Sequence, residues 1–131
     1  MDDIQLNLDT EEILKFLGVE PTSNPDTDEY ELYGVLDFIE DGENEQHFFT
    51  IEEMKFHEDF NWLMAVVNKI ENVGHTIVKM SKVYCEIIPV IYNINYDGMI
   101  WHDKIRCVGK NRLEATYEAV VEFIKWYNKK Q

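Results

Sequence analysis

The sequence is poor in residues that crosslink or interrupt a chain, and it lacks a long apolar run. Its 131 residues include only two cysteines, three prolines and six glycines. Cys85 and Cys107 have no metal-ligand spacing around them, and a reducing compartment would keep both as thiols, so we interpret them as small buried hydrophobes. No apolar run reaches the roughly twenty residues that a membrane helix needs, and no basic, apolar leader opens the chain. We therefore expect a soluble, cytoplasmic protein.

Basic residues are scarce in the first half of the chain. Residues 1–59 contain nineteen acids and only Lys15 and Lys55, a charge of −17, whereas residues 60–131 contain seven acids and ten bases, a charge of +3. A phosphate backbone would be repelled by the acidic half, so direct nucleic-acid binding is not expected. The partner that this charge favours is a protein with a basic surface.

The last helix has the strongest signals in the sequence. Asn111 and Glu114 form a capping box, which predicts a helix that continues to Asn128. Its apolar residues cover well over half of the helix surface, with Trp126 at one border. A helix of this kind needs more than one neighbour to cover it.

Two more helices are predicted earlier in the chain. Residues 60–73 have helical apolar spacing, a cap at Asp59 and an apolar arc bordered by Trp62. Asp9 and Glu12 match a second capping box, which predicts a short helix from residue 11 to residue 17.

Strand patterns fill the segments between these helices. Residues 30–38 alternate between apolar and polar side chains, and residues 47–51 follow an Asp41-Gly42 turn, which together predict a hairpin. A third strand is expected near residues 76–79. Residues 83–94 and 99–108 predict a second hairpin.

The second hairpin has a specific expected register. If Asp97 and Gly98 form a two-residue turn, apolar side chains face one another across the strands. Pro89 cannot donate a ladder hydrogen bond, so we expect an edge or a bulge there. The expected pairs are Ile94 with Trp101, Val90 with Ile105, and Ile88 with Cys107.

These elements predict a single α+β domain spanning residues 1–131, with the order α-β-β-α-β-β-α. The expected core is an antiparallel sheet with the two long helices packed on one face. The apolar arcs near Trp62 and Trp126 could be shared with the first helix or with a second subunit, which makes a homo-oligomer an open expectation.

No segment has the spacing of a known catalytic or metal-binding motif, and the histidines are scattered. We assign no catalytic, cofactor-binding or metal-ligating residue, and we interpret the histidines as surface groups. An enzyme with dispersed catalytic residues stays open. The four histidines are His47, His57, His75 and His102.

The acidic stretch from residue 26 to residue 59 contains thirteen acids and one lysine. Carboxylates displayed on a hairpin could imitate a nucleic-acid backbone and occupy a basic groove of another protein. A solvated outer face over a sheet is the competing interpretation. The candidate partner surface comprises Glu40, Asp41, Glu43 and Glu45.

A basic cluster precedes the last helix. Lys104 and Arg106 share a strand face, and Lys110 and Arg112 flank the start of the capped helix. A helix start offers free N–H groups and partial positive charge, so the four bases could hold a phosphate or a nucleotide. The competing interpretation is that they offset the acidic half of the molecule.

Residues 56–71 and 113–128 resemble small uncharacterised proteins encoded by phages and prophages of Bacteroidota, which have a Trp-Leu-Met type helix and a closing Glu-Phe-Ile-Lys-Trp-Tyr-Asn helix. The resemblance implies a phage-related origin in a host cell and implies no chemistry. The leading hypothesis is a non-enzymatic accessory protein that binds a host macromolecule through its acidic surface. The alternative is a small-ligand binder that holds an anionic nucleotide or phosphate at the basic strand-to-helix junction.

Overall fold

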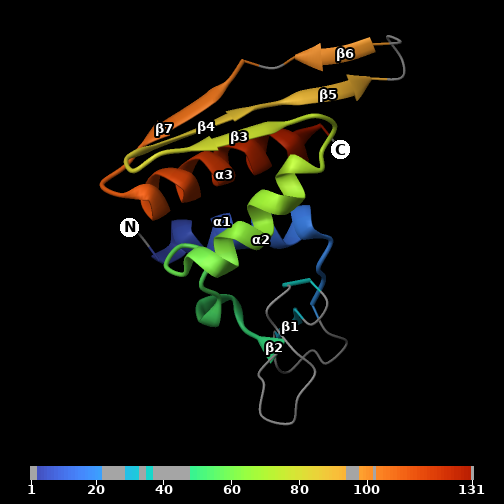
Figure 1. The fold of residues 1–131 in the computed structure, drawn as a ribbon. Coiled ribbons are helices and arrows are strands. Elements are labelled where there is room, and N and C mark those ends of the chain that lie inside the picture. Colours follow the sequence, from blue (N-terminus) through green and yellow to red (C-terminus); the bar gives the residue numbers. More distant parts are fainter. Residues whose placement is uncertain are drawn as a thin grey trace.

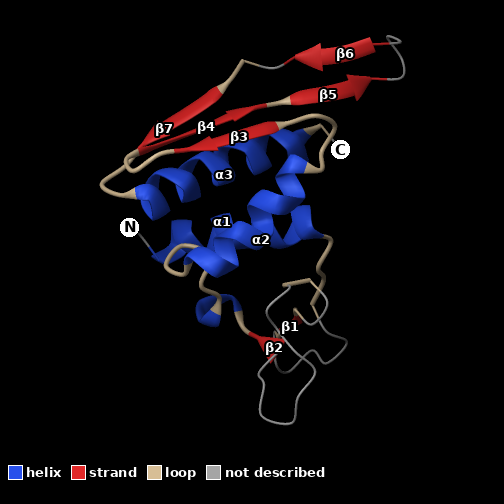
Figure 2. Ribbon diagram, viewed as in Figure 1, coloured by secondary structure: helices blue, strands red, loops and turns tan. Residues whose placement is uncertain are grey.

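The computed structural model describes residues 3–21, 29–32, 35–36, 48–93, 98–101 and 103–130, with the backbone alone for residues 91–93 and 98–101. Helices and antiparallel strands form the predicted α+β fold in roughly the predicted order (Figure 1 and Figure 2). The elements are α1 (Asp3–Leu17), β1 (Tyr30–Glu31), β2 (Phe48–Phe49), η1 (Ile51–Glu53), α2 (Phe60–Glu71), β3 (Ile77–Met80), β4 (Tyr84–Ile88), β5 (Val90–Asn93), β6 (Gly98–Trp101), β7 (Ile105–Val108) and α3 (Arg112–Lys129).

The helix α3 is the central layer of the molecule. It packs against β4 and β7 on one side and against α1 on the other, while α2 contacts both α3 and β3 (Figure 1). Its start is as predicted, because the Asn111 side chain accepts a hydrogen bond of 2.9 Å from the Glu114 backbone N–H. Apolar residues on several sides of α3 are buried, among them Ala115, Tyr117, Val120, Phe123 and Ile124.

The prediction for the first helix was wrong at its start. The helix α1 begins at Asp3, and Asp9 lies in its interior rather than at a cap. Asp9 is 6% exposed and accepts hydrogen bonds from Lys125 Nζ and Gln5 Nε2, each at 2.8 Å. A buried carboxylate needs such partners, and Lys125 of α3 supplies the charge.

The end of α1 is as expected. Gly18 has a φ of 77°, its N–H donates to Lys15 O at 3.1 Å, and the Val19 N–H donates to Leu14 O at 2.9 Å. This pair of bonds is a Schellman motif, which favours glycine because its left-handed backbone carries no Cβ penalty.

The main sheet has the strand order β3-β4-β7, and β5 pairs with β6 in a separate ladder; all pairs are antiparallel. The expected register was wrong. Cys107 faces Cys85, Ile105 faces Ile87, and Trp101 faces Val90. The connection is longer than a two-residue turn, because Asn93 pairs with Gly98. The expected contact of Ile94 lies outside the described residues.

Pro89 lies between β4 and β5, where the pairing shifts. Ile87 pairs with Ile105, and Val90 pairs with Trp101. The two residues between Ile87 and Val90 therefore lie opposite the three residues between Trp101 and Ile105. The extra residue lies between β6 and β7, so the bulge is opposite Pro89 and not in the strand that contains it, where it was expected.

The first hairpin is shorter than predicted. Among the residues that the structure describes, β1 and β2 pair through Tyr30 with Phe49 and Glu31 with Phe48. After β1 the chain turns, because the N–H groups of Val35 and Leu36 both donate to Leu32 O. The expected turn at Asp41 and Gly42 lies in a segment outside the described residues.

The second helix begins as predicted, because the Asp59 carboxylate accepts a 2.9 Å hydrogen bond from the Asn61 N–H. Trp62 is buried within the chain, with edge contacts to Phe49 at 5.0 Å and Phe56 at 5.2 Å between ring centroids. Its apolar surface is therefore covered by the segment before α2. A second subunit near the half-buried Trp126 stays a prediction.

Substitution of Phe123 tests whether α3 is buried between the sheet and α1. This side chain is fully buried and contacts the rings of Phe16 and Tyr127. We expect Phe123→Ala to lower the free energy of unfolding by about 3–5 kcal/mol, because it removes apolar contacts and leaves a cavity. Urea unfolding followed by circular dichroism measures this change. The exposed Lys129→Ala control should change it by less than about 0.5 kcal/mol, and a similar small effect for both variants would contradict the proposed packing.

Candidate functional site

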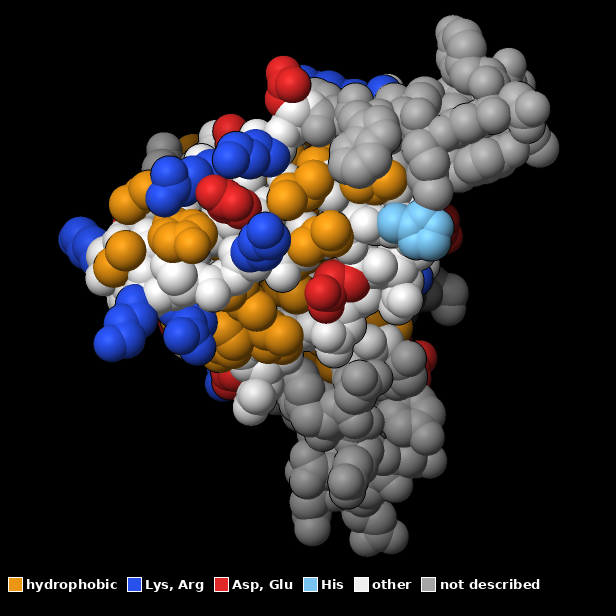
Figure 3. Space-filling model, turned by 45° about the horizontal axis from the view of Figure 1, so that its top comes forward, with side chains coloured by type: hydrophobic (Ala, Val, Ile, Leu, Met, Phe, Trp, Pro, Cys, Tyr) orange, Lys and Arg blue, Asp and Glu red, His pale blue; other side chains and the backbone are white. Residues whose placement is uncertain are grey.

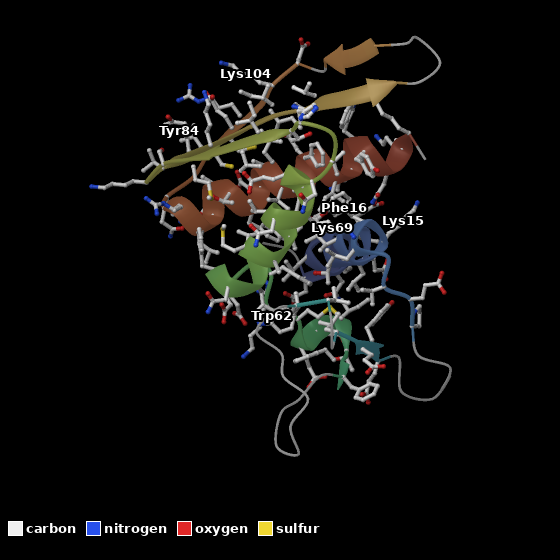
Figure 4. The ribbon with its side chains drawn as sticks, turned by 45° about the vertical axis from the view of Figure 1, so that its right-hand side comes forward. Lys15, Phe16, Trp62, Lys69, Tyr84 and Lys104 are labelled. Carbon is white, nitrogen blue, oxygen red and sulfur yellow. The ribbon has the colours of Figure 1, made fainter. Side chains whose placement is uncertain are left out.

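The β3-β4-β7 sheet has one covered face and one open face. Cys85 and Ile87 of β4 are buried against α3, and alternation along the strand places Tyr84 and Glu86 on the opposite side. In Figure 4, Tyr84 and Lys104 lie on the side of the sheet away from the helices. We define the outer sheet face by Ile77, Lys79, Tyr84, Glu86, Lys104, Arg106 and Val108.

Glu86 is the centre of the polar contacts on the outer sheet face. Its Oε1 lies 3.4 Å from Arg106 Nε and 3.8 Å from Lys104 Nζ, and Lys79 is its register partner on β3. The Arg106 guanidinium also lies over the Tyr84 ring, 4.6 Å from its centroid. Two cations therefore contact one carboxylate and a third lies opposite it on the next strand, so the face has a local positive charge in a chain of net charge −14.

The structure does not gather the four bases of the predicted anion site. Lys104 and Arg106 share Glu86 on the outer sheet face. Arg112 Nε donates instead to Ser81 O at 3.4 Å, beside the turn between β3 and β4. Lys110 lines a cleft at the start of α3. The separation follows from the end of β7, after which the chain leaves the sheet to begin α3.

The cleft at the start of α3 has a volume of about 430 Å³ and a mixed charge. Lys110 is its cation, while Glu114 and Glu118 bring negative charge. The Asn111 side chain already accepts from one N–H of the helix start. The remaining lining residues are Leu6, His57, Leu113 and Tyr117.

The acidic candidate surface is described only in part, because Glu40, Asp41, Glu43 and Glu45 lie outside the described residues. At the described ends of that stretch, Glu31 and Glu52 are exposed, and Phe48 is 41% exposed and pairs with Glu31. We call Glu31, Phe48 and Glu52 the acidic end. Figure 1 places their elements, β1, β2 and η1, on the side of the molecule opposite the main sheet.

Burial controls the chemistry of the two cysteines. It raises the pKa of the Cys85 thiol to about 11. Burial is also the largest cause that raises the pKa of Cys107 to about 12, followed by the hydrogen bond that its Sγ donates to Glu122 Oε2 at 3.3 Å. Both groups are neutral thiols near pH 7 and therefore weak nucleophiles. The interpretation of Cys85 as a buried hydrophobe is confirmed, and Cys107 is half-buried.

Tyr117 and His57 lie together beside the cleft. Their ring centroids are 6.3 Å apart, and His57 Nε2 lies 3.7 Å from a Glu58 carboxylate oxygen. Burial, with a smaller contribution from the charge of Asp9, raises the pKa of the Tyr117 hydroxyl above its ordinary value. This phenol is therefore uncharged at any physiological pH.

Among the residues that the structure describes, no group of three or more His, Cys, Asp or Glu side chains could hold a metal ion. In the same part of the chain, no helix is long and apolar enough to span a bilayer. His47 and His102 lie outside the described residues.

Comparisons with known proteins found no match for this chain. No family model matches it, and neither the curated proteins nor the solved structures include a match.

Sequence reasoning missed most of the outer sheet face. Lys104 and Arg106 were singled out, but Lys79, Tyr84 and Glu86 were not. Their alternating pattern is visible in the sequence, yet only the strand pairing places Lys79, Glu86 and Arg106 in one row across three strands. The expected pairing of Ile88 with Cys107 did not place Glu86 opposite Arg106, so it did not predict this row.

The thiol pKa values predict slow labelling by Ellman's reagent. At pH 8 we expect the native protein to react at least about a hundredfold more slowly than the urea-unfolded protein, because raising the pKa of Cys85 from 9.0 to about 11, and that of Cys107 to about 12, lowers the thiolate fraction by that factor or more. The native rate should still increase above pH 9, and Cys107→Ser separates the contribution of Cys85. A native rate that levels off near pH 9 would contradict the raised pKa values.

Proposed function

We propose that this protein is a non-enzymatic phage or prophage accessory protein that binds a host macromolecule, in the host cytoplasm, through its acidic stretch. The observation that carries the proposal is the separation of charge. Residues 1–59 have a charge of −17, and the exposed cations Lys79, Lys104 and Arg106 occupy the outer sheet face. The resemblance of two helical segments to phage-encoded proteins supports the accessory role.

The described part of the acidic stretch has the chemistry of a binding surface. The acidic end combines the carboxylates of Glu31 and Glu52 with the partly exposed ring of Phe48. Aromatic side chains are enriched at protein interfaces, and complementary charge accelerates association and selects the partner. The partner is expected to have a basic surface with an apolar centre.

Charge reversal tests this proposal. Replacing Glu40, Asp41, Glu43 and Glu45 with Lys should abolish capture of the partner from a lysate of the natural host, measured by quantitative mass spectrometry, because the reversed surface repels a basic partner.

The matched control reverses four exposed acids outside the acidic stretch and changes the net charge by the same amount. It should retain the captured partner. Capture that survives in the first variant, or that is lost equally in both, would contradict the proposal. The control acids are Glu11, Glu20, Glu71 and Asp103.

We propose as the second candidate a small-ligand binder that holds an anionic nucleotide or phosphate at the start of α3. Its support is the cleft of about 430 Å³ that Lys110 lines, beside the first residue of the helix, Arg112. The separation of Lys104 and Arg106 from this cleft, and its acids Glu114 and Glu118, make it the weaker candidate.

A thermal-shift panel of nucleotides tests the second candidate. Binding should raise the melting temperature, because a ligand at about a hundred times its dissociation constant stabilises the native state by about 2.7 kcal/mol. The rise should disappear in Lys110→Ala and Arg112→Ala. If no nucleotide shifts the wild-type protein at millimolar concentration, the candidate is wrong.

A further inference from the structure

The outer sheet face is open, although it contains apolar side chains. Val108 is 65% exposed and Ile77 is 47% exposed. No described element packs over these side chains, since α3 covers the opposite face. Figure 3 turns the top of the molecule forward and shows apolar side chains with Lys and Arg side chains among them. The face therefore offers exposed cations and separate exposed aliphatic side chains to a second molecule.

The charge of this face selects an acidic occupant. Lys79, Lys104 and Arg106 are exposed, and Glu86 is the carboxylate among them. An anionic partner that also carries apolar groups would satisfy both the cations and the exposed aliphatic side chains. A phosphate backbone fits less well, because it offers charge but no apolar group for Val108 and Ile77.

The same chain carries a surface of the required kind. The acidic end combines exposed carboxylates on Glu31 and Glu52 with the partly exposed ring of Phe48. Because the acidic end and the outer sheet face lie on opposite sides of the molecule (Figure 1), they cannot meet within one copy. They can meet between two copies.

We propose that the outer sheet face binds the acidic end of a second copy of this chain. The contact is heterologous, since different surfaces of the two copies meet, and each dimer has one outer sheet face and one acidic end outside the contact. The assembly therefore either closes into a ring or grows by addition at its ends. This proposal does not depend on a host partner.

Ionic strength gives the proposal a specific signature. At about 0.15 M salt the Debye length is about 8 Å, so the repulsion between two copies of net charge −14 is screened while charges in contact still attract. At about 0.01 M the Debye length is about 30 Å, and the overall repulsion weakens association. At about 1 M the contacts themselves are screened. Association should therefore be strongest at intermediate salt.

Sedimentation velocity over a range of protein and salt concentrations measures this association. The face variant, Lys79→Glu with Arg106→Glu, and the end variant, Glu31→Lys with Glu52→Lys, should each associate at least about tenfold more weakly than the wild type. An equimolar mixture of the two variants should recover association, because each reversed surface then meets its complement.

Two further variants keep the test independent of folding defects. Val108→Glu should weaken association without changing a salt bridge, and Glu86→Gln should strengthen it by removing the carboxylate that the acidic end must displace. Circular dichroism confirms that each variant is folded.

The proposal is overturned if the wild type is a monomer at every salt concentration up to millimolar protein. It is also overturned if the wild type associates but both double variants associate equally well. Loss of association in Trp126→Ala alone would assign the contact to a different, symmetric interface. A wild type that is monomeric but binds an acidic peptide through Arg106 would show that the occupant comes from another protein.

Discussion

The burial of α3 on two opposite sides is the constraint on which the rest of the fold depends. A helix that buries both Ala119 and Val121, which point to nearly opposite sides at 100° per residue, cannot lie at the surface of a two-layer domain. The sheet covers one side and α1 covers the other, so the molecule has three layers. This arrangement leaves the far side of the sheet without a helix.

Two polar contacts attach α1 to α3 and fix its position. Lys125 pairs with Asp9 near the middle of the interface, and the Asn128 side chain donates to both the backbone oxygen and the carboxylate of Glu12. Because Asp9 and Asn128 are buried, loss of either partner would leave a polar group without compensation. Apolar burial holds the layers together, while these contacts specify how α1 is aligned along α3.

Local signals predicted local structure well, and long-range pairing explains the failures. Asn111 and Asp59 cap helices as their sequence contexts indicate, because a cap involves only neighbouring residues. Asp9 resembles a cap in its local context, and only its distant partner Lys125 explains its place inside a helix. The hairpin register depended on an assumed turn length. The outer sheet face could not be predicted for the same reason, since Glu86 meets Arg106 through strand pairing.

Glu86 has a consequence for any molecule that binds the outer sheet face. Its carboxylate already occupies Arg106 and Lys104, so an incoming acid must exchange with a built-in competitor rather than fill a vacant site. Glu86 cancels part of the attraction between these cations and an incoming carboxylate. This favours a contact that forms and dissociates rapidly over a permanent one. Discrimination between partners then depends less on charge than on whether the partner also covers Val108 and Ile77. Glu86 can neutralise the cations, but it cannot cover these two aliphatic side chains.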